Sequence, residues 1–180
     1  SATLRHNGQP VAAANVLAME WDAEGSAFAL WKATQASSPG RQATSRTDGT
    51  FVLHGLPIRG QRLVIETADC ATWFSEPLSG AEGESLNLGT ITLVAGAGVE
   101  GTAEPNAIVY LDGQSSHRLT RTSHADSKGR FAFRNLPAGD YVLFYYSEDR
   151  TRPPTTPVRA ANRYPLTLLP GARKTVSLTP

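Results

Sequence analysis

Two stretches of this chain carry the same pattern: TDGTFVLHGLPIRG, residues 47–60, and ADSKGRFAFRNLPAGD, residues 125–140. Five positions recur at a constant offset of 80 residues: Gly49, Phe51, Leu53, Leu56 and Pro57 return as Gly129, Phe131, Phe133, Leu136 and Pro137. Just before them, Asp48 aligns with Asp126 at an offset of 78, which predicts that Ser127 and Lys128 are a two-residue insertion in the second turn. We interpret the repeat as an internal duplication.

The shared positions are those that build a strand between two turns. Asp48-Gly49 predicts a two-residue hairpin, because Asp tolerates positive φ and Gly has no Cβ to clash there. Phe51 and Leu53 then lie on one face of a strand and are expected to face a core. The Leu-Pro pair ends the strand, because Pro has no backbone N–H to donate to a sheet. His54, which is not repeated, is therefore not expected to mark a site.

Short runs of alternating apolar and polar residues, broken by Gly, Pro, Asn and Asp, recur along the whole chain and predict an all-β protein. The expected strands are residues 13–21, 28–33, 43–47, 50–56, 61–67 and 85–94, then 98–103, 107–112, 118–124, 130–136, 141–148, 166–169 and 174–179. The small residues of VAGAGVEG, 94–101, place a boundary near Gly96. We therefore predict two tandem Greek-key β-sandwich domains, residues 1–95 and 96–180.

Composition excludes several classes of protein. A net charge of +1 argues against a nucleic-acid protein that relies on phosphate neutralisation, although residues 1–95 carry −3 and residues 96–180 carry +4. No apolar run reaches the roughly 20 residues that cross a bilayer, so no membrane-spanning segment is expected. The single cysteine, Cys70, has no residue beside it that would act as a base, and we expect it to be a small core residue.

The motifs resemble a known family. GQPVAAANV, residues 8–16, followed by TDGTFVL, residues 47–53, and then Gly55-Leu56-Pro57, resembles carboxypeptidase regulatory-like domains, which are transthyretin-like β-sandwiches. Residues 126–143 resemble a second copy. The resemblance implies two tandem domains of transthyretin-like type, with the opening strand of the first short or missing, because its motif begins about a strand late. It also implies an accessory module of an exported or envelope protein.

Catalytic and metal-binding interpretations find little support in the residues. The hydroxyisourate hydrolases of the same fold end in Tyr-Arg-Gly-Ser, whereas this chain ends in VSLTP, so we expect no enzyme activity. The four histidines lack the spacing of a zinc site. Asp48 and Asp126 lack the second carboxylate, two residues on, that calcium loops usually have. No metal and no cofactor are therefore expected.

Two surface features remain as candidates for binding. In YVLFYY, residues 141–146, alternation predicts an outer apolar row of Val142, Phe144 and Tyr146. Such a row marks a contact, either within the chain or with a protein or sugar. The segment DRTRPPTTPVRAANRYP, residues 149–165, is expected to be a loop that suits an anionic partner unless it is merely solvated, through four arginines: Arg150, Arg152, Arg159 and Arg163.

The first half offers a different candidate. Trp73 lies in a segment expected to be irregular, where loop aromatics suit a carbohydrate platform, and Trp31 is a second candidate of this kind, with ordinary core or rim packing as the alternative. The sequence thus predicts a structural or protein-interaction module that is secreted, periplasmic or on the cell surface. Its expected partner is another protein of the cell surface or envelope. The alternatives are a carbohydrate-binding module and an accessory domain pair of a larger enzyme.

Overall fold

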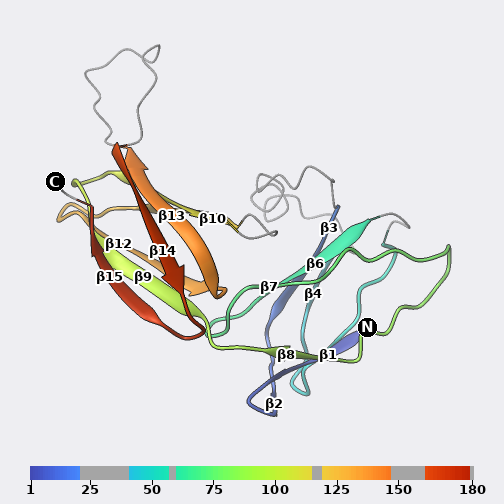
Figure 1. Cartoon of the computed structure of the whole chain (residues 1–180). Coiled ribbons are helices and arrows are strands. Elements are labelled where there is room, and N and C mark those ends of the chain that lie inside the picture. The colour runs from blue at the N-terminus through green and yellow to red at the C-terminus, as the bar shows by residue number, and fades with distance from the viewer. Residues whose placement is uncertain (21–40, 57–59, 115–118, 147–160, 179–180) are drawn as a thin grey trace. The chain divides into compact units, whose positions relative to one another are not determined.

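The computed structural model describes residues 1–20, 41–56, 60–114, 119–146 and 161–178, and every regular element in these ranges is a β-strand (Figure 1). The backbone divides into two compact units, Ser1–Gly96 and Ala97–Pro180. Each unit contains two β-sheets. The predicted all-β, β-sandwich class is confirmed. No helix in the described ranges is long and apolar enough to cross a bilayer.

The first unit is built around a short central strand. In one sheet, β1 (Ala2–His6) pairs antiparallel with β5 (Thr50–Phe51) and β2 (Gln9–Pro10), and parallel with β8 (Thr90–Leu93). The other sheet has the order β4 (Gln42–Thr44), β3 (Asn15–Glu20), β6 (Gln61–Glu66) and β7 (Trp73–Phe74). One core joins the two sheets, with Leu4, Phe51 and Leu93 from the first and Val16, Leu63 and Ile65 from the second.

The second unit repeats this arrangement with longer strands. Its three-stranded sheet has the order β12 (Arg130–Leu136), β9 (Ala97–Thr102) and β15 (Arg173–Ser177). Its four-stranded sheet has the order β11 (Thr120–His124), β10 (Ile108–Gly113), β13 (Gly139–Tyr146) and β14 (Ala161–Leu168). Strand β9 pairs antiparallel with β12 and parallel with β15, just as β1 pairs with β5 and β8. The two units therefore share one plan of strand pairing.

The two repeated turns have the same length, so the predicted insertion of Ser127 and Lys128 is wrong. Two equivalent backbone hydrogen bonds of 2.8–2.9 Å close each turn: Arg46 N to Thr50 O and Gly49 N to Arg46 O in the first, Asp126 N to Arg130 O and Gly129 N to Asp126 O in the second. The offset is 80 throughout, and each loop has three residues that end in a left-handed glycine, not the predicted two-residue hairpin. The sequence alignment misled because Asp48 and Asp126 occupy different positions of the same turn.

Each of these glycines lies against the central strand of its unit. Gly49 has a φ of +82° and Gly129 a φ of +77°. A Cβ on Gly49 would collide with the carbonyl oxygen of Leu4, and a Cβ on Gly129 would collide with that of Ala103. The same contacts carry backbone hydrogen bonds, from Leu4 N to Gly49 O at 2.9 Å and from Ala103 N to Gly129 O at 2.8 Å. Glycine is required at both positions for the turn conformation and for this close approach.

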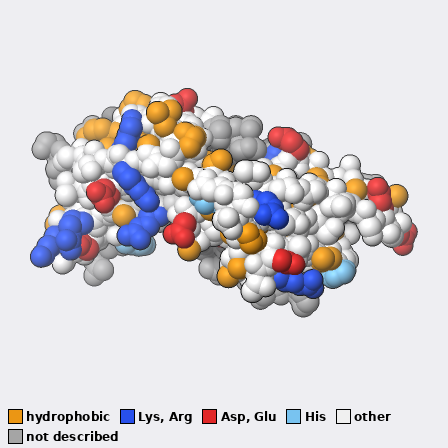
Figure 2. All heavy atoms as spheres, turned by 90° about the horizontal axis from the view of Figure 1, so that it is seen from below, with side chains coloured by type: hydrophobic (Ala, Val, Ile, Leu, Met, Phe, Trp, Pro, Cys, Tyr) orange, Lys and Arg blue, Asp and Glu red, His pale blue; other side chains and the backbone are white. Residues whose placement is uncertain are grey.

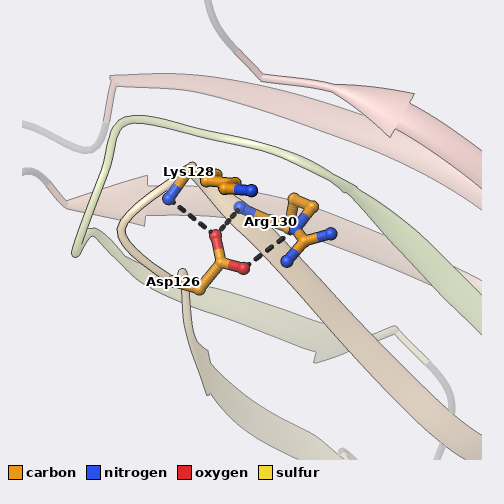
Figure 3. Close-up of polar contacts among 3 residues, drawn as sticks. All are labelled: Asp126, Lys128 and Arg130. Atoms are coloured by element: carbon orange, nitrogen blue, oxygen red, sulfur yellow. Dashed lines mark hydrogen bonds and ion pairs between the residues drawn. The ribbon is translucent and has the colours of Figure 1, made fainter.

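The second turn is further fixed by the Asp126 carboxylate (Figure 3). Its Oδ1 accepts hydrogen bonds from the backbone N–H groups of Lys128 and Arg130, both at 2.8 Å, and its Oδ2 accepts one from Arg130 Nε at 2.9 Å. In the first turn, Asp48 Oδ1 instead accepts from the backbone N–H and the hydroxyl of Thr50, at 2.9 and 2.7 Å. Each aspartate therefore organises its turn, and each does so from a different position.

Several expected strands differ from the observed ones. The strand at residues 130–136 is confirmed as β12. The opening strand of the first unit is not missing: β1 has five residues against six in β9. Of the strand expected at residues 50–56, only Thr50–Phe51 belongs to a sheet. Strand β14 begins at Ala161, five residues earlier than expected, and the strand expected at 28–33 lies outside the described residues.

Replacing Gly49 with Ala is expected to destabilise the first unit by more than about 2 kcal/mol. Left-handed backbone costs a residue with a Cβ about 1–2 kcal/mol, and the contact with Leu4 O adds to this cost. Gly8 is a matched control, because its φ is +77° but a Cβ there would meet nothing within 4 Å. Urea unfolding measures both variants, and equal losses would contradict the close-approach argument.

The pKa of the Asp126 carboxyl is expected to lie below 3.8, because the backbone N–H and then the guanidinium of Arg130 stabilise its charged form. The charged carboxylate therefore contributes to the stability of the folded state. This contribution is present above the unfolded pKa of about 3.9 and is lost as the pH falls through the lower folded pKa. Arg130→Ala keeps both N–H donors, so it should raise the pKa only part of the way. A carbon-13 NMR titration measures this, and a full return to 3.8 would assign the shift to the guanidinium instead.

Candidate functional site

Strand β13 presents alternate side chains to the core and to the outside. Tyr141, Leu143 and Tyr145 are buried, whereas Val142 and Phe144 are only half-buried on the opposite face, as the period of two predicts. The Tyr141 hydroxyl donates a hydrogen bond to Pro137 O at 2.8 Å, and burial raises the pKa of Tyr141 to about 12. Tyr141 is thus a core residue and not an acid or base for chemistry at neutral pH.

Phe144 lies in a stack that crosses three strands. It is directly opposite Tyr110 in the pairing of β10 with β13, and the two rings are stacked with centroids 5.4 Å apart and planes 6° from parallel. From β14, Cζ of the exposed Arg163 lies 5.8 Å from the centroid of the Phe144 ring, within cation–π range. We name Tyr110, Val142, Phe144 and Arg163 the aromatic row.

Polar pairs lie on the strands on both sides of the aromatic row. Thr120 Oγ1 donates to Asp112 Oδ1 at 2.9 Å between β11 and β10, and Thr167 Oγ1 donates to Asp140 Oδ1 at 2.5 Å between β14 and β13. The sheet face therefore combines a half-buried aromatic centre with a hydrogen-bonded polar surround, which is the usual composition of a protein-binding patch.

The structure places only part of the predicted arginine cluster. Arg163 belongs to β14 and not to a loop, while Arg150, Arg152, Arg159 and the side chain of Tyr146 lie outside what is described. Other exposed basic residues occur on β12, β15 and the Asp126 turn: Lys128, Arg130, Arg134, Arg173 and Lys174. Figure 2 shows Lys and Arg side chains gathered on one face of the second unit, which agrees with the positive charge of this half of the sequence.

Trp73 lies in a strand and not in the irregular segment that the sequence predicted. It belongs to β7, where it is directly opposite Ile65 of β6, and its side chain is partly buried against the core of the first unit. The expectation of an irregular segment was wrong because a two-residue strand leaves almost no periodic signal. Trp31 lies outside the described residues.

The first unit has a groove of about 720 Å³ that the sequence analysis did not find. Segments 51–56 and 78–88 form its walls, Ser1 lies at its end, and Leu63 contributes from β6. Six of its nineteen lining residues are leucine, and His54, Glu82 and Glu84 contribute ionisable side chains. The groove can be recognised only when the strand pairing is known. Its walls come from segments that lie apart in the sequence and share no local sequence pattern.

The described residues do not form a metal-binding cluster. No group of three or more His, Cys, Asp or Glu residues in these ranges is placed to hold a metal ion. Cys70 is buried, and His6 Nδ1 is 2.9 Å from the backbone oxygen of Leu93 in a structural contact between β1 and β8. The aromatic row and the groove are the features of the described residues that could bind a partner.

No protein-family model matches the chain, and no curated protein matches it significantly. Among solved structures, it is similar to GBS52, the minor pilin of Streptococcus agalactiae, at 13% identity and a TM-score of 0.34 over 98% of this chain and 93% of that one. The Bacillus anthracis TIE protein matches at 14% identity and a TM-score of 0.36, over 98% of this chain and 32% of that one. A putative adhesin from Bacteroides ovatus matches at 12% identity and a TM-score of 0.31, over 99% and 88%. Similarity at this level carries no argument about activity or partner.

Replacing Trp73 with Ala is expected to destabilise the first unit by about 2 kcal/mol or more, because it removes a partly buried ring that packs on the core. Trp73→Phe keeps a ring there and should lose less than half as much. Thermal unfolding of the two variants tests this difference. If Trp73→Ala leaves the unfolding midpoint unchanged, the side chain is a surface feature and the carbohydrate-platform hypothesis regains its basis.

Proposed function

We propose that this chain is a non-enzymatic interaction module of an exported or cell-surface protein, and that the aromatic row is where it contacts a protein partner. The observation that carries the proposal is the stack of Tyr110, Phe144 and Arg163 on the outer face of the sheet β11-β10-β13-β14. Aromatic and arginine side chains are the residue types most enriched where binding energy concentrates in protein interfaces.

Rigidity of the sheet supports this use of the row. Phe144 is held on a strand paired on both sides, and the side chains that flank it along β13 are buried tyrosine and leucine. A partner would therefore meet side chains that lose little conformational entropy on binding, because the stack already restricts their rotamers.

We further propose that the two units are tandem carboxypeptidase regulatory-like domains of transthyretin-like type. The shared plan of strand pairing, the identical closing hydrogen bonds of the two turns and the offset of 80 residues support descent from one duplicated domain. Such domains are accessory modules, and this supports a location outside the cytoplasm and the absence of an activity of their own.

A carbohydrate partner is the alternative, because an aromatic face also stacks on sugars. Trp73 packs partly buried against the core of the first unit, which supports this alternative less than a fully exposed ring would. The other alternative, an accessory pair within a larger enzyme, uses the same surface for a contact inside one polypeptide.

Phe144→Ala is expected to weaken capture of the partner by more than about tenfold, because it removes the centre of the stack. Leu169→Ala is a matched control, since Leu169 is a large apolar side chain of the same unit that is 69% exposed and lies outside the aromatic row. The immobilised chain and both variants would be presented with extracellular protein from the source organism and with a panel of polysaccharides.

Two outcomes would contradict the proposal. If Phe144→Ala and Leu169→Ala retain the captured protein equally well, the aromatic row is not the contact. If the chain retains a polysaccharide and Phe144→Ala alone loses it, the partner is a carbohydrate. Thermal unfolding of Phe144→Ala checks that the second unit remains folded in either case.

A further inference from the structure

The sheet β12-β9-β15 of the second unit has an outer face that is separate from the aromatic row. Phe131 and Phe133 of β12 are buried in the core, whereas Arg130 and Arg134, which alternate with them along the strand, are exposed. The pairings with β9 and β15 carry this alternation across the sheet. The outward positions of the other two strands are Gly98, Glu100 and Thr102 on β9 and Arg173, Thr175 and Ser177 on β15.

The basic face, as we name this set of outward residues, lacks the composition of a protein interface. Its residues all lie within the described ranges, and none of them is aromatic or a large aliphatic residue. Affinity between proteins concentrates in aromatic and well-packed apolar contacts. The basic face instead offers charges and hydroxyl groups, which suit a hydrated and charged partner.

Arg173 lies flat across the central strand of the basic face. It is directly opposite Gly98 in the pairing of β15 with β9. A Cβ on Gly98 would collide with Nη1 of Arg173 and would lie 3.1 Å from its Cδ and 3.3 Å from its Cζ. The absence of a side chain at Gly98 therefore lets the guanidinium of Arg173 reach over β9, toward β12.

A second arginine approaches the same place from the other side. Phe133 is opposite Val99, so the next residue, Arg134, lies on β12 at the level of Gly98. Neighbouring strands are about 4.8 Å apart, so the guanidinium of Arg173 lies about one strand spacing from the strand that carries Arg134. The two guanidinium groups can therefore contact one and the same anion. We name Arg134 and Arg173 the arginine clamp.

Charge alternates along the basic face. The arginine clamp forms no ion pair with a carboxylate of the described ranges, so both of its positive charges are uncompensated. At the start of β12, four residues or about 13 Å from Arg134, the turn combines Lys128 and Arg130 with the single carboxylate of Asp126. Glu100 lies between the two positive centres. The order along the face is therefore positive, negative, positive.

The arginine clamp is not part of the repeated framework. The first copy has His54 at the position of Arg134, although it keeps the turn glycine and Phe51. Figure 2 shows Lys and Arg side chains gathered on one face of the second unit. The fold does not require these charges, so variants that remove one of them are expected to stay folded.

A linear polymer with widely spaced acidic groups complements this order of charges. Guanidinium groups bind carboxylates through two parallel hydrogen bonds. Uncharged groups between successive carboxylates would lie over Glu100, and their hydroxyls would donate to its carboxylate and contact the hydroxyls of Thr102 and Thr175. A polymer with an acidic group on every unit would bring a negative charge next to Glu100 and would be repelled there.

We propose that the basic face binds an acidic polysaccharide in which carboxylated sugars alternate with uncharged ones. One carboxylate would bind the arginine clamp, and the next would bind Lys128 and Arg130 at the turn. The uncharged sugar between them would donate its hydroxyls to Glu100. This partner goes beyond the protein contact proposed above, and the aromatic row lies on the other sheet of the second unit, so either proposal can fail without the other.

Hyaluronate, in which glucuronate alternates with uncharged N-acetylglucosamine, is a suitable probe, with neutral dextran as the comparison. Calorimetric titration of hyaluronate fragments into the whole chain at low salt should give a dissociation constant below about 1 mM, and dextran should not bind. Arg134→Gln and Arg173→Gln should each weaken binding at least about fivefold, because each removes a bidentate contact. Lys174→Gln is the matched control, since it removes the same charge from the other side of β15, and it should weaken binding less than about twofold.

Gly98→Ala separates a positioned clamp from an effect of charge alone. The added methyl group displaces the flexible side chain of Arg173 and leaves the net charge unchanged. It should weaken hyaluronate binding at least about threefold. Thermal unfolding checks that this variant is folded, and the arginine variants carry the test if it is not.

Several results would overturn the proposal. They are equal behaviour of hyaluronate and dextran, equal losses in Lys174→Gln and Arg173→Gln, and unchanged binding by a folded Gly98→Ala chain. Polygalacturonate, with a carboxylate on every sugar, should bind more weakly than hyaluronate, and tighter binding would contradict the argument from charge spacing. Tighter binding of poly-L-glutamate than of hyaluronate would make the partner an acidic polypeptide instead.

Discussion

Each unit depends on one central strand that is hydrogen-bonded along both edges. One of its neighbours is antiparallel to it and the other is parallel. Strand β9 pairs antiparallel with β12 and parallel with β15, and β1 is paired in the same way with β5 and β8. Buried backbone N–H and C=O groups must be hydrogen-bonded, and the neighbours satisfy those of the central strand only along the stretch where they pair with it. The repeated turn is placed against this strand through its glycine, which fixes where the next strand begins.

The two units obey this constraint to different extents. In the second, β12 pairs with β9 from Arg130 to Leu136, and the phenylalanines of β12 are buried. In the first, β5 ends at Phe51, and segment 52–56 forms one wall of the groove with Leu53 and Leu56 half-buried. The candidate binding surfaces thus lie where the two copies differ: the aromatic row, whose Val142 and Phe144 were predicted from the period of two, and the groove, which lies beside a segment that is repeated in sequence but not in strand pairing.

The sequence predicted features that depend on a local period and missed those that depend on pairing. Strand β12 and the alternation of β13 follow from residues that are adjacent in the chain, so both were predicted correctly. Strand β1 offers only Ala2 and Leu4 as a periodic signal, and its parallel partner begins 87 residues later, where no turn connects the two. The outward position of Phe144 was predicted from the period of two. Its contact with Tyr110 could be recognised only from the register between β10 and β13. Predicting the groove would have required the register of both the β1–β5 and the β1–β8 pairings.

The central claim is that the two copies of the repeat differ in pairing: segment 52–56 leaves its sheet after Phe51, whereas its counterpart stays paired along β12. Hydrogen exchange of the Leu53 and Phe133 amides, measured by NMR on the chain alone, tests this most directly. These two residues occupy the same position of the repeat, but Phe133 is paired with Val99 of β9, whereas no strand of the described residues is paired with Leu53. The account predicts rapid exchange at Leu53 and at least about a hundredfold slower exchange at Phe133. Equal protection of the two amides would contradict it.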